Sequence, residues 1–382
     1  MTASVRWGLL LLLSLAGCAT PDGSPDGDDR SPNPGESSDD VVASSPSGVT
    51  NANGSGGDGR EDKADPPEPE LVVHSLANLG DSISQGFDAD DAKPLDLNQV
   101  VTNHDAVFHD NAPLSWVQGS DARVGSVASH YKAKDAKLVV TPLSRSGAEL
   151  VGKSTSLPNL EKQARAIATK NVTPDLVYVL LGGNDVCNRQ PSKTSDATAT
   201  LYSVEEWRAA AVKGLVALAE VLPAGATVRF VSMPRVDLLY EALKDTTVPV
   251  KVSSPLGPVD GTSTCADLWT VTASQGAGIC KIVTTETNAA RRKAIGERID
   301  AYNTALAEEV RKMDADPTRN PKKISFQSDW HGSLDAGAVK NSSVGTFVFQ
   351  PAHVSKLDCF HPSIAGQHEI ASHVLSRAKW KP

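Results

Sequence analysis

The chain has 382 residues, of which 40% are hydrophobic and 22% charged, a composition that suits a globular protein with a sizeable core. Its formal net charge of −9 argues against nucleic acid as a partner, because binding phosphates needs clustered Lys and Arg. The acidity is local: residues 19–68 hold 12 acidic and 3 basic side chains, whereas the chain from Pro69 onward has a net charge of −1.

The first 18 residues resemble a bacterial lipoprotein signal peptide. Residues 1–6 carry one positive charge, and the apolar run 8–15 is too short to span a bilayer, which needs about 20 residues. The run ends in the sequence LAGC at 15–18, which resembles a lipobox, so we expect Cys18 to be lipidated. An ordinary secretory signal is the alternative. Acyl chains anchor by apolar burial, and stable attachment needs more than one of them.

Residues 19–68 are rich in Ser, Gly, Pro, Asp and Asn, with few large apolar side chains. Such a stretch cannot bury enough surface to offset its ordering entropy, so it is interpreted as a disordered tether. We therefore expect a signal peptide at 1–18, a tether at 19–68 and one folded domain at 69–382. The whole is expected to be a monomeric, exported lipoprotein that is either extracellular or held in the cell envelope, at the outer membrane if the host is Gram-negative.

The folded part alternates between two kinds of segment. Apolar runs predict five strands, at 71–79, 137–143, 175–181, 227–233 and 323–327. Amphipathic stretches predict helices at 121–133, 157–170, 204–222 and 285–313. This alternation predicts an α/β fold, a three-layer α/β/α sandwich around a mostly parallel sheet of about five strands. Residues 239–283 are expected to form an irregular insertion, and 345–350 are left open as a strand or a loop.

Two motifs follow the first two predicted strands. The sequence NLGDSI at 78–83 places Ser82 just after a strand, where backbone N–H groups of a helix start can stabilise an oxyanion. The sequence SRSGA at 144–148 contains Gly147, whose lack of a side chain lets its N–H approach a ligand closely. Either motif alone is more often an ordinary turn.

Two further motifs lie later in the chain. The sequence LGGND at 181–185 follows a buried run; Asn184 can donate a side-chain N–H, and Asp185 is expected to hold the loop through backbone hydrogen bonds. The sequence DCFHP at 358–362 places Asp358 three residues before His361. A carboxylate there can orient Nδ1–H of the imidazole and leave Nε2 free to take a proton from a serine.

Together the motifs supply a nucleophile, a base, a residue that orients the base, and oxyanion donors. They are similar to the four blocks of the SGNH (GDSL) hydrolase superfamily, which correspond here to Ser82, Gly147, Asn184 and His361, with Asp358 as the triad acid. The resemblance implies a flavodoxin-like fold and a serine esterase whose oxyanion hole combines Ser82 N–H, Gly147 N–H and the Asn184 amide. It implies no metal and no cofactor.

The residues around two of these motifs resemble one branch of the superfamily more than the others. The sequences GNDVC at 183–187 and DCFH at 358–361 resemble the phospholipase-B-like branch, which favours lipid esters as substrates. Ile83 stands where Leu is usual, and the 239–283 insertion has no clear counterpart. A carbohydrate O-acetyl esterase is the alternative, and a non-catalytic surface binding lipoprotein is the alternative from another class. The pairs His104-Asp105 and His109-Asp110 fit no standard zinc spacing and are interpreted as a solvated loop.

If Cys18 is lipidated, four cysteines remain, an even number that predicts two disulfides in an exported chain. Three pairings are open. We favour Cys265–Cys280, which are close in sequence, and Cys187–Cys359, which both flank motifs of the expected site.

Overall fold

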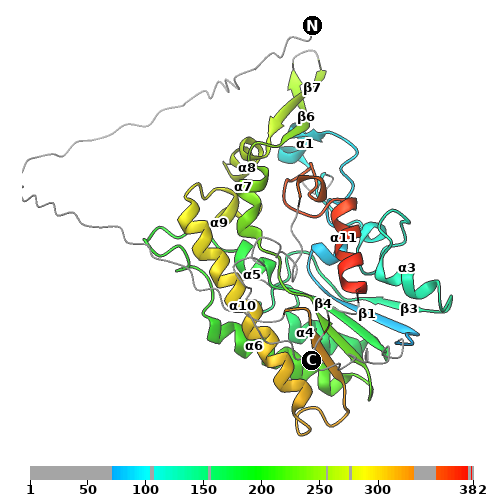
Figure 1. Ribbon diagram of the computed structural model, residues 1–382. Helices are drawn as coiled ribbons and strands as arrows, with labels where there is room; N and C mark the ends of the chain where they lie inside the picture. The colour runs from blue at the N-terminus through cyan, green and yellow to red at the C-terminus, as the bar shows by residue number, and fades with distance from the viewer. Residues whose placement is uncertain are drawn as a thin grey trace, which may run out of the picture. The chain divides into compact units, whose positions relative to one another are not determined.

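The computed structural model describes residues 71–380 except 104–106, 154–155, 255–256, 275–277, 331–349 and 377–379 (Figure 1). The expected signal peptide, Cys18, the tether and nearly all of the open segment 345–350 lie outside the described residues. Within the described part, no helix combines the length and the apolar character that crossing a membrane requires.

Five parallel strands form the main sheet, in the order β3-β1-β4-β5-β8. Their bounds are β1 Ser75–Gly80, β3 Val139–Pro142, β4 Leu176–Leu180, β5 Thr227–Phe230 and β8 Ser325–Ser328. Numbered along the chain, this is the order 2-1-3-4-5 of flavodoxin-like folds, in which the sheet changes direction beside its first strand. A crevice for ligands is therefore expected beyond the carboxyl end of β1.

Both faces of the sheet are covered, which the buried strand β4 shows directly. Leu176, Tyr178 and Leu180 pack in one core cluster with α3 (Val127–Lys132) and α11 (Ile364–Leu375). Val177 and Val179 point the other way, as alternate strand residues must, and belong to the cluster on the opposite face. That face is covered by α4 (Leu160–Thr169), α6 (Val204–Val221) and α10 (Ala289–Ala315). The predicted three-layer sandwich is confirmed (Figure 1).

Capping residues determine where two of the helices begin. The Ser203 side chain accepts from Glu206 N–H and the Glu206 side chain from Ser203 N–H, a capping box that begins α6. The prediction of a helix from 121 was wrong: α3 begins at Val127, because Gly125 has a left-handed φ of 58° and Ser126 caps the helix by accepting from Ser129 N–H.

The described residues of the segment 239–283 lie largely in helices and strands, so the expectation of an irregular insertion was wrong. The segment contains α7 Leu239–Leu243, β6 Thr247–Ser254, β7 Gly257–Thr264, α8 Cys265–Ser274 and α9 Lys281–Thr284. The antiparallel pair β6–β7 joins β2 (Leu95–Asp96) in a second sheet, with α1 (Leu97–Thr102) directly after β2. Val248 and Val250 of β6 are buried in the core, which anchors the hairpin.

The remaining helices of the described residues are single turns or little more. They are α5 Gly183–Cys187 and the 3-10 segments Ile83–Gln85, Ala112–Leu114, Val236–Leu238 and Pro351–His353.

The disulfide pairing differs from the one favoured from the sequence. Cys187 is bonded to Cys280, and Cys265 is bonded to Cys359. The expected pairs Cys265–Cys280 and Cys187–Cys359 were therefore wrong. Each bond instead joins the insertion to a motif loop, because α8 lies beside the 358–361 loop while α9 lies beside α5.

Candidate active site

The structure brings Ser82, Asp358 and His361 together at the carboxyl end of β1. Ser82 lies two residues after the end of the buried strand and occupies the N-cap position of the 3-10 turn Ile83–Gln85, without a side-chain capping bond. Its Oγ lies 2.8 Å from Nε2 of His361, and Nδ1 of His361 lies 2.5 Å from Oδ2 of Asp358. All three residues are buried. These are the distances at which a serine hydroxyl can pass its proton to an imidazole held by a carboxylate.

The loop that carries Asp358 and His361 is held by its own backbone and by the insertion. Oδ1 of Asp358 accepts from the N–H groups of Phe360 (2.8 Å) and His361 (3.0 Å), while Cys359 between them has a left-handed φ of 56°. From α8, the Trp269 indole donates to the Asp358 carbonyl at 3.2 Å. The disulfide to Cys359 fastens the same helix to the same loop.

Gly147 and Asn184 lie next to each other. Nδ2 of Asn184, on α5, donates to the Ala148 carbonyl at 3.0 Å, and Gly147 has a left-handed φ of 79° that favours glycine. The carboxylate of Asp185 accepts from two consecutive backbone N–H groups, those of Leu150 (2.6 Å) and Val151 (2.9 Å). The predicted role of Asp185 in holding the loop is confirmed. Burial raises the pKa of Asp185, and the two donors oppose this shift.

The loops of these motifs also flank the Ser82 loop. Arg145 N–H donates to the Gly80 carbonyl at 3.0 Å, and Nε2 of Gln85 donates to the Ser144 carbonyl at 2.6 Å. On the other side, a Cβ atom on Gly183 would lie 3.7 Å from Oδ2 of Asp81. The four motifs therefore line one end of the sheet.

Two buried glutamines support this end and were not identified from the sequence. Gln163 of α4 accepts from Gly80 N–H (2.8 Å) and donates to the Gly80 carbonyl (3.0 Å), which fixes the end of β1. Gln367 of α11 donates to the Ile83 carbonyl (3.1 Å) and accepts from Trp116 N–H (2.9 Å). Their only signal in the sequence is a polar side chain on the apolar face of a helix.

Two buried carboxyls beside the triad were also missed. Asp81 accepts from Ile83 N–H at 3.0 Å through Oδ1, while its Oδ2 is buried with no hydrogen-bond partner. Burial raises the pKa of Asp81 to about 7. Asp88, six residues after Ser82, is also buried, and one of its carboxylate oxygens, one of Asp358 and a ring nitrogen of His361 lie within 4.8 Å of one another.

Aromatic side chains surround the imidazole. The ring centroids of Phe87 and Phe360, both partly exposed, lie 4.7 Å and 5.3 Å from that of His361. Trp116, Trp269 and Trp330 are all buried, so their side chains pack in the interior and do not line an open site. Of the pairs considered as metal ligands, His104-Asp105 lies outside the described residues, and Asp110 accepts a hydrogen bond from the Ser146 hydroxyl.

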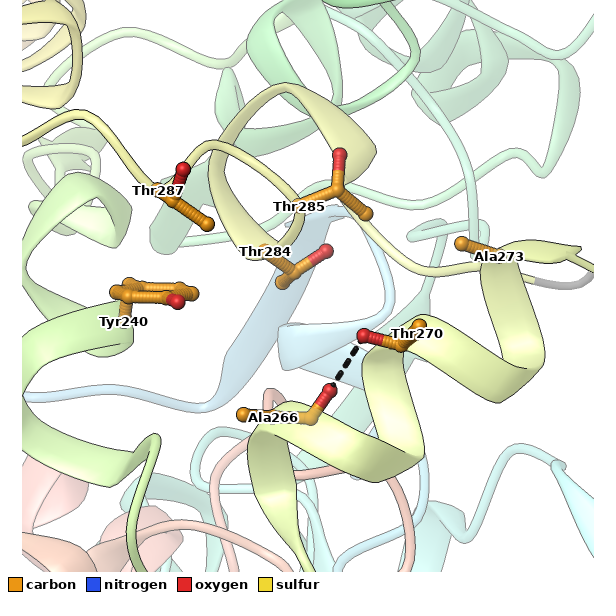
Figure 2. Close-up of a pocket in the computed structure, with 7 residues that line it drawn as sticks. All are labelled: Tyr240, Ala266, Thr270, Ala273, Thr284, Thr285 and Thr287. Atoms are coloured by element: carbon orange, nitrogen blue, oxygen red, sulfur yellow. Dashed lines mark hydrogen bonds between the residues drawn. The ribbon is translucent and has the colours of Figure 1, made fainter.

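A cavity of about 260 Å³ lies apart from the triad, between α7, α8 and the segment around α9 (Figure 2). Its lining is rich in threonine and consists of Tyr240, Ala266, Thr270, Ala273, Thr284, Thr285 and Thr287. The hydroxyls of Thr270, Thr284 and Thr285 donate to backbone carbonyls, so what they offer a ligand is chiefly acceptor capacity.

Comparison with solved structures finds two likenesses of note. A family two carbohydrate esterase from Clostridium thermocellum, in complex with cellohexaose, has 12% sequence identity and a TM-score of 0.37 over 80% of this chain and 63% of its own. The chain thus spans less than two thirds of that protein. A protein from Lactobacillus plantarum has 15% identity and a TM-score of 0.33 over 80% of this chain and 96% of its own. Likenesses at TM-scores this low carry no argument about substrate.

The comparison with sequence families is decisive. No curated protein matches the chain closely enough to count as a relative. The model of the GDSL-like lipase/acylhydrolase family, however, matches residues 76–374, a span that contains every motif described above. The chain therefore belongs to the GDSL-like lipase/acylhydrolase family.

Proposed function

We propose that the protein is a serine esterase that works through an acyl-enzyme. The observation that carries the proposal is the chain of contacts from Ser82 Oγ to His361 Nε2 (2.8 Å) and from His361 Nδ1 to Asp358 Oδ2 (2.5 Å). Ser82 attacks the ester carbonyl while His361 takes its proton and Asp358 stabilises the imidazolium. His361 then returns the proton to the leaving alcohol, and a water that it activates hydrolyses the acyl-enzyme.

The oxyanion of the tetrahedral intermediate is assigned to the N–H groups of Ser82 and Gly147 and to the Asn184 amide. Support comes from the loop geometry: Asn184 is tied to the carbonyl beside Gly147, and Asp185 holds the two following N–H groups. Donors that are fixed before the reaction need no reorganisation as charge develops, which is where such sites gain most of their effect.

The substrate class that we propose is a lipid ester. The resemblance of the GNDVC and DCFH motifs to the phospholipase-B-like branch favours a lipid ester. The partly exposed rings of Phe87 and Phe360 beside His361 also offer an apolar surface to an acyl chain. A carbohydrate O-acetyl esterase is the rival. A series of p-nitrophenyl esters from acetate to laurate separates the two: a rate that rises with chain length supports the lipid ester, and a clear preference for acetate contradicts it.

The triad is tested with the full chain and p-nitrophenyl butyrate. Ser82→Ala is expected to abolish turnover, whereas Ser274→Ala, at an exposed position at the end of α8, should leave it unchanged. A fluorophosphonate should label the parent at Ser82 alone. Turnover that survives in Ser82→Ala would count against this assignment, and a folded parent with neither turnover nor labelling would favour a non-catalytic binding protein.

We also propose that the protein is exported and anchored through Cys18. The two disulfides support export, since such bonds persist in oxidising compartments. In bacteria that express the full chain, Cys18→Ser should move it from the detergent phase to the aqueous phase of a Triton X-114 separation. An unchanged distribution would contradict lipidation at Cys18.

A further inference from the structure

Asp88 is an acidic side chain buried against the triad, with no part in the mechanism given above. It is 3% exposed, as is Asp358. The polar atoms that Asp88, Asp358 and His361 bring together lie within 4.8 Å of one another. Two carboxyls this close, both out of water, cannot both ionise without a large cost.

The backbone around Asp88 holds the carboxyl in place. Asp88 N–H donates to the His109 carbonyl at 3.1 Å, and His109 N–H donates to Oδ1 of Asp88 at 3.0 Å. Asp88 has a left-handed φ of 53°, and the ring of the preceding residue, Phe87, packs on the His361 imidazole. A non-glycine residue in this conformation costs free energy, which the surrounding contacts must offset.

The hydrogen bonds stabilise a negative charge on Asp358 more than on Asp88. Asp358 faces the imidazole of His361 and accepts from two backbone N–H groups, so its ionised form is stabilised. Asp88 accepts from one backbone N–H, and its Oδ2 is buried with no donor opposite it. An oxygen without a donor is satisfied if it carries a proton itself and donates.

The charged groups around Asp88 also favour its neutral form. Burial raises the pKa of Asp88 to about 10, and the negative charges of Asp358 and Asp110 act in the same direction, against the single N–H of His109. Burial and the neighbouring negative charges therefore both favour the neutral acid form of Asp88. Carboxylic acids kept neutral in apolar sites act as hydrogen-bond donors.

We propose that Asp88 is a positioning residue which, as a neutral acid, donates a hydrogen bond to the Asp358 carboxylate and fixes the oxygen that receives Nδ1–H of His361. This inference rests on the proposed esterase mechanism. Asp88 touches neither Ser82 nor the substrate in this role; it acts through Asp358 alone. The opposite assignment is an ionised Asp88 that adds a second negative charge beneath the imidazolium.

Substitutions at Asp88 separate the two assignments, because asparagine keeps a donor but never carries a charge. Asp88→Asn is expected to keep kcat for p-nitrophenyl butyrate within about threefold and to leave the pH at half-maximal kcat in place. Asp88→Ala should lower kcat about 10- to 100-fold with little change in KM, and should shift that pH, because Asp358 loses its donor. Asp90→Asn and Asp90→Ala, at an exposed position of the same loop, are the matched controls and should behave as the parent.

An Asp88→Ala protein with parental kcat and pH profile would overturn the proposal, and so would an Asp88→Asn protein as impaired as Asp88→Ala. The proton is tested without turnover by infrared spectra of Ser82→Ala at pH 8, with and without Asp88→Asn. The difference spectrum should contain the carbonyl band of one protonated carboxyl; a carboxylate band in its place would overturn the proposal. A parent without esterase activity would count against the triad alone, because the infrared result stands by itself.

Discussion

Asn184 shows how one side chain serves both the fold and the site. One of its amide hydrogens is donated to the Ala148 carbonyl at 3.0 Å, and the proposed mechanism assigns the second to the substrate oxygen. We expect Asn184→Ala to lower kcat about 10²- to 10³-fold with a small change in KM, as loss of one oxyanion donor does elsewhere. Asn98→Ala, at an exposed position of α1, is the matched control. A loss of less than about threefold in kcat for p-nitrophenyl butyrate would contradict the assignment.

The buried carboxyl of Asp81 makes the stability of the fold depend on pH. Its pKa is raised from 3.8 to about 7 by burial, so between those values the folded chain holds a proton that the unfolded chain releases. Stability from this group is therefore fully present below about pH 4, falls as the pH rises, and is lost above about pH 7, by up to about 4 kcal/mol.

Asp81→Asn should remove this slope, since the amide oxygen still accepts from Ile83 N–H and never ionises. The free energy of unfolding in urea, measured at pH 4.5 and pH 7.5, should fall with pH less steeply in the variant than in the parent. Equal slopes in the two proteins would show that Asp81 is ionised in the folded state.

At the scale of elements, α4 and α6 approach each other closely at Gly214. Alanine usually stabilises a helix by about 1 kcal/mol relative to glycine. Here a Cβ atom would overlap the Leu160 side chain of α4, and overpacking of this kind typically costs 1–3 kcal/mol. Gly214→Ala is therefore expected to lower the melting temperature by several degrees, whereas the neighbouring Lys213→Ala, at an exposed position, should not. A higher melting temperature for Gly214→Ala would show that Leu160 moves aside freely.

The elements differ in how well the sequence reveals them. Strand β4 was predicted from its uninterrupted run of apolar residues. Such a run is typical of a central parallel strand, and β4 is indeed buried on both faces. The β6–β7 hairpin was missed, although Val248, Val250 and Val252 alternate in a period of two, because Pro249 and the polar β7 weaken the pattern. Such a hairpin gains its stability from β2 and α1, which are distant in the chain.

The motifs of the site were visible in the sequence because each follows a strand or precedes a helix, and parallel strands end on one side of a sheet. Asp88 was not visible, because nothing in its neighbours shows that the chain will turn it toward Asp358. The disulfide partners were not visible either, since their choice depends on the path of the insertion between Leu239 and Val283.

At the scale of the whole molecule, the two disulfides close loops of nearly equal length. They join residues 93 and 94 positions apart, so each restricts the unfolded chain to a similar degree, about 4–5 kcal/mol in the chain-entropy model. We expect Cys187→Ala/Cys280→Ala and Cys265→Ala/Cys359→Ala to lose similar free energies of unfolding.

Their effects on turnover should differ, because Cys359 lies between Asp358 and His361 whereas Cys187 lies three residues beyond Asn184. Loss of the Cys265–Cys359 bond is expected to lower kcat about 10-fold, and loss of the other bond by less than about threefold. Urea unfolding and p-nitrophenyl butyrate kinetics on the two double variants measure both quantities. Equal losses of kcat would show that the triad loop is held well enough by its own hydrogen bonds.

The distance along the chain between Ser82 and His361 has a consequence for biosynthesis. The two residues are 279 positions apart, and the imidazole belongs to the loop just before the final helix, α11. A ribosome therefore adds Ser82, the proposed nucleophile, long before it adds His361, the proposed base. A chain still being made, or one cut short before that loop, contains a serine with no partner to activate it. Under the proposed mechanism, an unfinished chain is therefore inactive.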